Sequence, residues 1–288
     1  MNLNSGKRQW LVSFVLATCM ASCGGQENVK AAAETAGSAF RYELDKPQTI
    51  TLPQGINEIS GISYNPADNT VFAVDDENGY LFKISLDRQP VVENWEFDKK
   101  RDFEEIAVVN NKAYVLVSSG KLVYFPVSFP VKNITTASLD IEGRNEFESL
   151  YHDPAANRLL MMCKDCKGDG KDAVSIYGFD LRTNTFDSRA IGVLNTSGIN
   201  KKSGKKTDRF KPSAARIHPQ TGELYIISSV NKMLVVADKN FTIKEVRRLD
   251  SSIFKQPEGL DFTPSGDMLI SNEAGGSGNA NILLFRQK

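Results

Sequence analysis

Short apolar runs alternate with polar turns along most of the chain, and the pattern is clearest in residues 256–285. This segment contains three apolar runs, Leu260–Phe262, Met268–Ser271 and Ile282–Phe285, and a Pro-Ser-Gly-Asp turn separates the first two. Runs of this length that are bounded by Gly, Pro, Asn and Asp are typical of β-strands joined by tight turns. The pattern therefore predicts three consecutive β-strands in this segment.

The same order of runs and turns occurs in four earlier segments, so the chain contains five copies of one unit. A polar or acidic residue opens each copy, and these equivalent residues are Ser60, Glu104, Glu148, Ser213 and Glu258. Successive copies are 44, 44, 65 and 45 residues apart, and the long interval includes two insertions, Lys164–Asp172 and Ser197–Arg209. Repeats of roughly 40–50 residues with several strands each are typical of β-propeller blades.

Each interval between copies also has room for a fourth, outer strand. The candidate outer strands are Pro90–Phe97, Asn133–Ile141, Phe186–Leu194 and Phe241–Leu249. The last copy ends at Lys288 with three strands, and Gln48–Leu52 can supply the missing one, which would remove exposed sheet edges. We therefore predict an all-β, five-bladed β-propeller over residues 47–288, with four antiparallel strands per blade and the last blade closed by the N-terminal strand. An unclosed β-solenoid or a sandwich is the alternative.

The first residues are typical of a targeting segment. A basic pair, Lys7 and Arg8, precedes an apolar run, Trp10–Ala17, that is too short to span a bilayer. Small residues then precede Cys23, and this arrangement resembles a bacterial lipoprotein signal in which the cysteine becomes the lipidated first residue. We expect a lipoprotein signal peptide at residues 1–22. Cleavage before Cys19 is a poorer alternative, and a simple secretory signal is another.

The residues after Cys23 predict a tether to the membrane. Residues 24–39 consist largely of Gly, Ala, Glu and Ser, and such a segment buries too little apolar surface to fold. We therefore expect a lipidated cysteine and flexible tether at residues 23–46, with the membrane as a partner through the lipid anchor. Because Gly24 rather than an aspartate follows Cys23, we expect a cell-envelope protein on the outer rather than the inner membrane.

Charge and cysteine content exclude several classes of partner. The chain has 35 basic and 35 acidic residues, so its charge balance gives no reason to expect a nucleic-acid partner. We also expect the protein to be a monomer. The one basic run, Lys201–Lys211, is read as a solvated insertion loop, with an anion-binding patch as the alternative. Cys163 and Cys166 lack the two further ligands that zinc needs, which leaves a local disulfide or two free thiols.

The repeat predicts a ring of acidic side chains. In a propeller the first strand of each blade lines the central channel, so Glu104, Glu148 and Glu258 should meet near one mouth. The ends of the second strands return to that mouth, and the residues there are Asp75, Ser119, Lys164, Ser229 and Glu273. Crowded carboxylates must protonate, pair with a cation or hold a metal, and oxygen ligands of this kind suit Ca²⁺. The alternative is that these glutamates cap backbone N–H groups and stay solvated.

The two histidines are not placed to assist a metal at this mouth. His152 and His218 both lie in the turn after a first strand, at the opposite face from the acid ring, where they are expected to bond to the backbone. A catalytic base would then have to be Glu273, Asp75 or Asp76, all of them weak candidates. No serine has a histidine partner that the sequence can identify.

Several segments resemble the SdiA-regulated family of bacterial extracytoplasmic proteins. They are DFEEI (102–106), FESL (147–150), PSAARIHP (212–219), QPEGLDF (256–262) and ISNEAGG (270–276). The resemblance, which runs from about Ile50 to Phe285, implies a five-bladed propeller with a Ca²⁺ site and no assigned activity. It makes Glu104, Glu148 and Glu258 the best ligand candidates.

The sequence departs from the family pattern at several of these positions. Glu105 and Ser149 stand where glycine commonly follows the acid, and Ser60 and Ser213 replace the acid itself. The ligand set is therefore incomplete on sequence alone. The Cys-Lys-Asp-Cys insertion is also not part of the general pattern.

Two functional hypotheses follow from the sequence. The first is a lipid-anchored extracytoplasmic propeller with a channel Ca²⁺ site that binds a small molecule or a protein without catalysis. The alternative is a Ca²⁺-dependent hydrolase of the lactonase or esterase type, in which the ion polarises a carbonyl group.

Overall fold

Antiparallel β-sheets account for nearly all regular structure in the computed structural model, which describes residues 40–204, 206–276 and 278–288. The first sheet contains β2 (Ile59–Asn65), β3 (Thr70–Asp75), β4 (Tyr80–Ser85) and β5 (Val92–Glu96). The second contains β6 (Phe103–Val109), β7 (Lys112–Val117), β8 (Lys121–Pro126) and β9 (Thr135–Ser138). The predicted signal peptide and Cys23 lie outside the described residues, as do most residues of the predicted tether.

Three further sheets follow in chain order. The third contains β10 (Asn145–Asp153), β11 (Arg158–Cys166), β12 (Ala173–Asp180), β13 (Thr185–Phe186) and β14 (Gly192–Asn195). The fourth contains β15 (Ala214–Ile217), β16 (Leu224–Ser228), β17 (Met233–Ala237) and β18 (Ile243–Arg248). The fifth combines β19 (Pro257–Phe262), β20 (Met268–Asn272) and β21 (Asn281–Phe285) with β1 (Gln48–Thr51).

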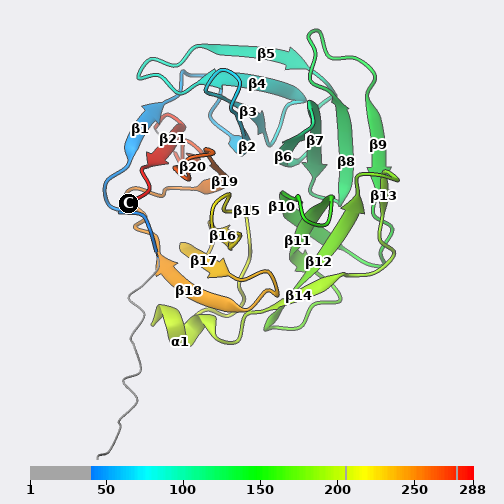
Figure 1. Cartoon of the computed structure of the whole chain (residues 1–288), viewed down its shortest axis with the longest axis vertical. Coiled ribbons are helices and arrows are strands. Elements are labelled where there is room, and N and C mark those ends of the chain that lie inside the picture. The colour runs from blue at the N-terminus through cyan, green and yellow to red at the C-terminus, as the bar shows by residue number, and fades with distance from the viewer. Residues whose placement is uncertain (1–39, 205, 277) are drawn as a thin grey trace, which may run out of the picture. The chain divides into compact units, whose positions relative to one another are not determined.

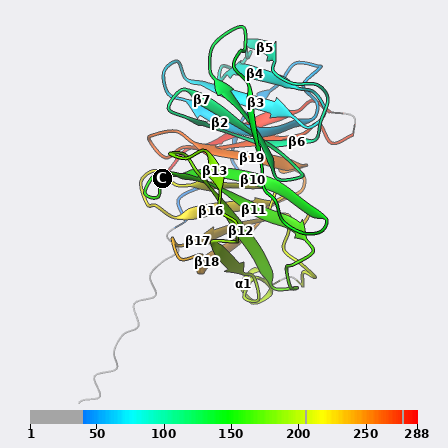
Figure 2. The same ribbon diagram turned by 90° about the vertical axis from the view of Figure 1, so that its right-hand side faces the viewer.

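The five sheets are arranged as blades around a central axis (Figure 1). The innermost strand of each blade is β2, β6, β10, β15 or β19, and each contacts the next around the ring, including β19 with β2. Figure 2 shows the same blades from the side. The prediction of an all-β, five-bladed propeller is confirmed, and the repeat spacing was sufficient to count the blades.

The N-terminal strand supplies the outer strand of the fifth blade. β1 pairs antiparallel with β21, with Gln48 opposite Leu284 and Thr51 opposite Asn281. Ile50 is fully buried and packs in one apolar cluster with Ile282 and other residues of the first and fifth blades. The two ends of the propeller sequence are therefore joined in one sheet.

The predicted outer strand Phe186–Leu194 of the third blade is two short strands in the structure. β13 pairs with the end of β12, and β14 pairs with its beginning. Between them the chain bends, and Asp187 accepts a hydrogen bond from Arg158 at 2.6 Å. The prediction of one continuous strand was wrong because regular pairing with β12 is interrupted between Asp187 and Ile191, although the N–H groups of these two residues still donate to carbonyls of β12.

The middle strands of the blades are buried on both faces. All described residues of β3, β16, β17 and β20 are buried, because each blade packs between two neighbours. Their sequences accordingly read as continuous apolar runs rather than as an alternation. Of the described residues, none belongs to a helix that is long and apolar enough to span a membrane.

Candidate functional site

A β-bulge at the start of the inner strands aims three glutamates at one mouth of the channel. In β6, β10 and β19 the pairing register shifts across Glu104, Glu148 and Glu258, so each of these residues is the extra one in its strand. A bulge redirects a side chain and ends regular pairing, and it is common beside functional sites. The three predicted metal ligands therefore occupy equivalent, re-aimed positions at what we call the acid mouth.

The acid mouth holds its carboxyl groups in an environment that disfavours ionisation. Burial and then the charge of Asp102 raise the pKa of Glu104 to about 9, although Lys164 opposes the shift. Burial raises the pKa of Glu258 to about 7, while hydrogen bonds from Ser229 and nearby positive charges oppose it. Glu104 and Glu258 are close enough for the charge of one to raise the pKa of the other.

One basic side chain enters this cluster. Lys164, which follows Cys163 in β11, forms an ion pair with Glu148. The bulge redirects Glu148, and the end of β11 carries Lys164, so the two charges come together. This agrees with the prediction that Lys164 lies at the same mouth as the glutamates. Glu148 is in this way neutralised by the protein itself.

A second group of carboxylates meets at the junction of the first and fifth blades. Oxygen atoms of Glu58, Asp76 and Glu273 all lie within 4.8 Å of one another. The backbone fixes this arrangement, because the Asp76 N–H donates to the Glu58 carbonyl at 3.1 Å and the Ala274 N–H donates to the Asn57 carbonyl at 2.9 Å. We call these three residues the carboxylate triad.

The triad has the properties of a cation site. Burial, followed by the charge of Glu58, raises the pKa of Asp76 to about 6. Burial, followed by the charge of Glu258, raises the pKa of Glu273 to about 8. Asp76 Oδ1 is buried and has no hydrogen-bond partner among the described residues. An all-oxygen, anionic donor set with one unsatisfied buried oxygen fits a hard divalent cation such as Ca²⁺.

The structure brings together some predicted site residues and separates others. Glu104, Glu148 and Glu258 share the mouth, but among the described residues they do not form a group whose oxygens all lie within 4.8 Å. Asp76 and Glu273, named as weak candidates for a base, lie in the triad. Asp75 instead accepts hydrogen bonds from the backbone and side chain of Asn78 in its own turn.

Glu58 is the member of the triad that sequence reasoning missed. The first copy of the repeat has Ser60 at the equivalent position and so seemed to lack an acid. Glu58 precedes β2 by one residue and bonds through its carbonyl to Asp76, directly after β3. Reading the residues on both sides of each strand start, rather than one aligned position, would have found this acid.

At the opposite mouth the channel is closed by Arg216, which is 7% exposed. Its Nε donates to the Leu260 carbonyl at 3.1 Å and pairs with Asp261 at the same distance. Its Nη2 donates to the carbonyls of Ile62 at 2.7 Å and Ile106 at 3.3 Å. One arginine of β15 therefore contacts three other inner strands and fills the axis of the propeller.

Both histidines lie at this second mouth, as the sequence predicted from their position in turns. His218 is fully buried, and its Nδ1 accepts from the N–H groups of Gln220 and Thr221, each at 3.2 Å. Its Nε2 meets the Tyr42 hydroxyl at 2.9 Å. His152 differs, because its Nε2 is buried and has no hydrogen-bond partner among the described residues.

The model of the SdiA-regulated family matches residues 33–275. The chain belongs to this family. The match covers all five inner strands and both mouths of the channel. No curated protein matches the sequence.

Solved structures that resemble this family member share its fold at low sequence identity. Glutaminyl cyclase from Myxococcus xanthus has a TM-score of 0.53 at 15% identity, over 83% of this chain and 96% of its own. Luciferin-regenerating enzyme has a TM-score of 0.52 at 11% identity, over 83% of this chain and 95% of its own. At such identities the likeness shows the propeller fold and nothing about chemistry.

The two insertions of the third interval contact each other through an ion pair between Asp165 and Arg209. Cys163 and Cys166 form a disulfide. Asp165, between them, pairs with Arg209 at 3.0 Å and with Lys211 at 2.9 Å. Two charges of the basic run are thus neutralised within the protein, which reduces the case for an anion-binding patch.

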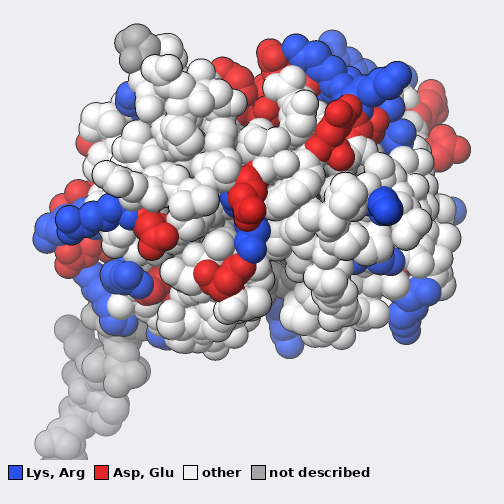
Figure 3. Space-filling view, turned by 90° about the horizontal axis from the view of Figure 1, so that it is seen from above, with Lys and Arg blue, Asp and Glu red and all other residues white. Residues whose placement is uncertain are grey.

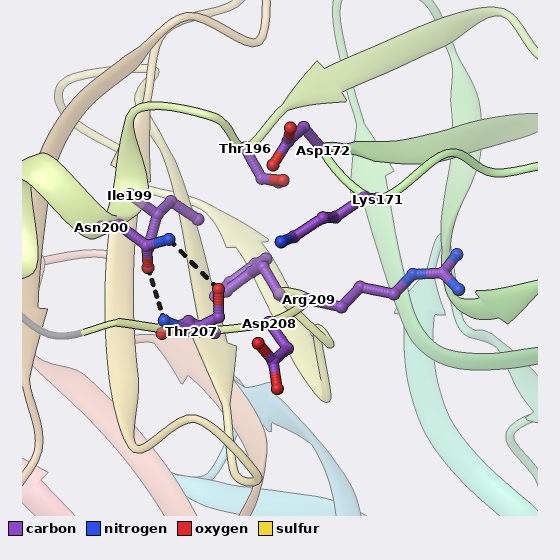
Figure 4. Close-up of a pocket in the computed structure, with 9 residues that line it drawn as sticks. Lys171, Asp172, Thr196, Ile199, Asn200, Thr207, Asp208 and Arg209 are labelled. Carbon is purple, nitrogen blue, oxygen red and sulfur yellow. Dashed lines mark hydrogen bonds between the residues drawn. The ribbon is translucent and has the colours of Figure 1, made fainter.

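The short helix α1 (Ile199–Ser203) borders a small pocket in this insertion (Figure 4). Asn200 both donates to the Thr207 carbonyl at 3.1 Å and accepts from its N–H at 2.7 Å. The pocket has a volume of about 10 Å³, which is room for about one water molecule. This space is too small for a phosphate group.

Acidic and basic side chains lie interspersed among uncharged ones on the side of the propeller that Figure 3 shows. A nucleic-acid surface typically has basic residues gathered on one face. The mixed surface on this side agrees with the expectation of no nucleic-acid partner, which stays a prediction.

Proposed function

We propose that this SdiA-regulated protein is a binding module of the cell envelope that holds Ca²⁺ at the acid mouth and presents this mouth to a ligand or partner. The observation that supports it best is the carboxylate triad, in which the buried Asp76 Oδ1 has no partner among the described residues. In this proposal Glu58, Asp76 and Glu273 supply the first ligands.

A bound cation resolves the electrostatic problem of this mouth. Two carboxylates about 4 Å apart repel by about 4 kcal/mol at an effective dielectric constant of roughly 20. The nearby lysines relieve the triad only in part: the charge of Lys164 opposes the shift of Glu273, but burial and the neighbouring carboxylates still raise the pKa of Glu273 to about 8. A divalent ion would neutralise the triad and let Glu273 ionise at neutral pH.

The N-terminal segment gives the proposal its location. A lipidated Cys23 followed by a tether would hold the propeller at the membrane, with the outer membrane favoured by Gly24. Anchored in this way, a monomeric propeller has both channel mouths free to meet a ligand from the envelope.

The same geometry supports the hydrolase alternative less well. In the hydrolase alternative, a carboxylate that is not a ligand of the ion would take the proton of the attacking water. Asp76 and Glu273 belong to the triad, and Asp75 is occupied by Asn78. The candidate bases are therefore either ligands or already bonded, and a binding role is the simpler function.

The test is a thermal melt of the mature protein with calcium and with a chelator. A ligand at about a hundred times its dissociation constant stabilises the native state by about 2.7 kcal/mol, which corresponds to several degrees for a domain of this size. We expect this rise to be lost in Glu58→Gln and in Glu273→Gln. The exposed Glu93→Gln on β5 is the matched control and should keep the full rise.

Two outcomes would contradict the assignment in different ways. An unchanged calcium effect in both triad variants would show that the ion binds elsewhere. Loss of the effect only in Glu104→Gln and Glu258→Gln would place the ion on the glutamates that the sequence predicted. Calcium-dependent turnover of a simple lactone would instead support the hydrolase.

A further inference from the structure

A second concave site lies at the mouth opposite the carboxylates, at the far ends of the inner strands. It has a volume of about 460 Å³, within the range of roughly 300–1,000 Å³ that is common for small-molecule pockets. Four of its residues are prolines from four different blade turns, Pro66, Pro154, Pro219 and Pro264. We call it the proline-rimmed cleft.

The walls of the cleft are mainly apolar and rigid. The cleft is also lined by Val108, Ile217, Phe262 and Tyr64. Proline has a fixed φ and little side-chain freedom, so such walls lose little entropy when a ligand binds. The cleft is therefore formed before any ligand arrives.

The floor of the cleft offers a hydrogen-bond donor. Arg216 lines it, and the contacts of this side chain involve only Nε and Nη2. Its Nη1 has no partner among the described residues, although the side chain is more than nine-tenths buried. Because Arg216 lines the cleft, this nitrogen is available to donate a hydrogen bond to a ligand oxygen.

One wall of the cleft offers a second polar group. His152 lines it, and the buried Nε2 of this histidine lacks a partner among the described residues. Burial lowers the pKa of His152; the charge of Asp153 opposes the shift and that of Arg216 adds to it, so the imidazole is neutral at neutral pH. Two unsatisfied polar groups thus belong to one cleft, whereas the other histidine, His218, is fully bonded.

The charges around the cleft decide what kind of ligand fits. Arg216 is paired with Asp261, whose two oxygens also accept from the N–H groups of Tyr64 and Phe262 at 2.7 Å each. The pair has no net charge, and His152 is neutral. A charged ligand would therefore be buried without a counter-ion, which is costly, whereas an uncharged ligand with an oxygen acceptor would satisfy Nη1.

We propose that the proline-rimmed cleft binds a small uncharged molecule with an apolar body and a carbonyl oxygen, which accepts a hydrogen bond from Arg216 Nη1. His152 Nε2 makes the second polar contact. This site is separate from the carboxylate triad, because the two lie at opposite ends of the same inner strands.

The experiment compares three probes that share one ring and differ in the head group: benzamide, benzoate and benzylamine. Binding to the mature protein is measured by saturation-transfer NMR and by titration. We expect benzamide to bind in the millimolar range and about fivefold or more tighter than either charged probe.

Two variants locate the bound probe. Val108→Phe fills the cleft from its wall and should abolish benzamide binding, while Val91→Phe, at a site that is 66% exposed, should leave it unchanged. His152→Ala removes one polar contact from a turn and should weaken binding about fivefold. It serves as the second test if Val108→Phe does not fold.

Three results would overturn the proposal. The first is the absence of saturation transfer to benzamide at millimolar concentration. The second is tighter binding of benzoate or benzylamine than of benzamide. The third is benzamide affinity that stays unchanged in the folded cleft variants. Binding that is equal with calcium and with chelator, and equal in Glu273→Gln, would show that the cleft acts independently of the acid mouth.

Discussion

Arg216 is the residue at which most of the inner strands meet. It lies in β15 and donates hydrogen bonds to carbonyls of β2, β6 and β19, as well as pairing with Asp261. Close by, Glu105 is fully buried, and burial raises its pKa well above the usual range, although the charge of Arg216 opposes the shift. One buried ion pair and one buried acid therefore lie in the channel between its two mouths.

Removing Arg216 should destabilise the fold strongly. Arg216→Met leaves Asp261 buried without its partner, and breaking a buried ion pair in this way costs about 3–5 kcal/mol. Adding Asp261→Asn should restore part of this loss. Glu105→Gln is the control and should change the free energy of unfolding by less than about 1 kcal/mol, since glutamine keeps the size of the side chain and the oxygen that accepts from the Ile106 N–H.

The measurement is equilibrium unfolding in urea, with the slope compared between variants. If Arg216→Met were as stable as the unmodified protein, the arginine would not hold the inner strands together. If the double variant were no better than Arg216→Met, the loss would come from the missing backbone hydrogen bonds rather than from the unpaired carboxylate.

At the scale of the strands, the sequence predicted the elements better than the directions of their side chains. The spacing of Glu104, Glu148 and Glu258 identified truly equivalent positions, because each is the extra residue of a bulge. A bulge leaves no trace in hydrophobic periodicity beyond one extra residue, so the sequence could not say which oxygens would meet. Glu58 and Asp76 come together through pairing across β2 and β3, which no aligned position records.

The pairing of β1 with β21 makes a prediction about neighbouring residues of one strand. Ile50 is fully buried beside Ile282, whereas Thr49 is exposed. Ile50→Asp should therefore lower the free energy of unfolding by more than about 3 kcal/mol, because it buries an unpaired charge. Thr49→Asp should stay within about 1 kcal/mol, and chemical denaturation of both variants measures the difference.

Similar losses in the two variants would mean that β1 is not held on the fifth blade with this register. Soluble aggregates that form only in Ile50→Asp would instead support the pairing of β1 with β21. They would show that displacing β1 exposes the edge of β21 to pairing with another molecule.

At the scale of the whole molecule, the propeller separates two environments at the ends of the same five strands. The acid mouth crowds carboxylates with raised pKa values, and the proline-rimmed cleft is apolar and has no net charge among its buried groups. The buried groups of the channel lie between them. In the two roles that we propose, an ion binds at one end and an uncharged molecule at the other.

The acid mouth also sets how stability depends on pH. Burial raises the pKa of Glu104 to about 9 and that of Glu273 to about 8, both from a usual value of 4.5. Between pH 4.5 and these values the folded state retains protons that the unfolded chain releases. The contribution of these groups to the free energy of unfolding is therefore fully present below pH 4.5 and is lost as the pH rises toward 8–9.

Calcium should reverse this loss, because it binds the ionised carboxylates and competes with their protons. In thermal melts with a chelator, the melting temperature should fall between pH 6 and pH 8.5, and the rise produced by calcium should be larger at pH 8.5 than at pH 6. Glu273→Gln removes one of the titrating groups. It should therefore weaken the pH dependence of the melting temperature in chelator and also reduce the rise produced by calcium. A calcium effect that is equal at both pH values would show that the ion does not bind these carboxylates. Loss of the pH dependence in Glu93→Gln, which lies far from the mouth on an outer strand, would show that the titration reports net charge rather than the acid mouth.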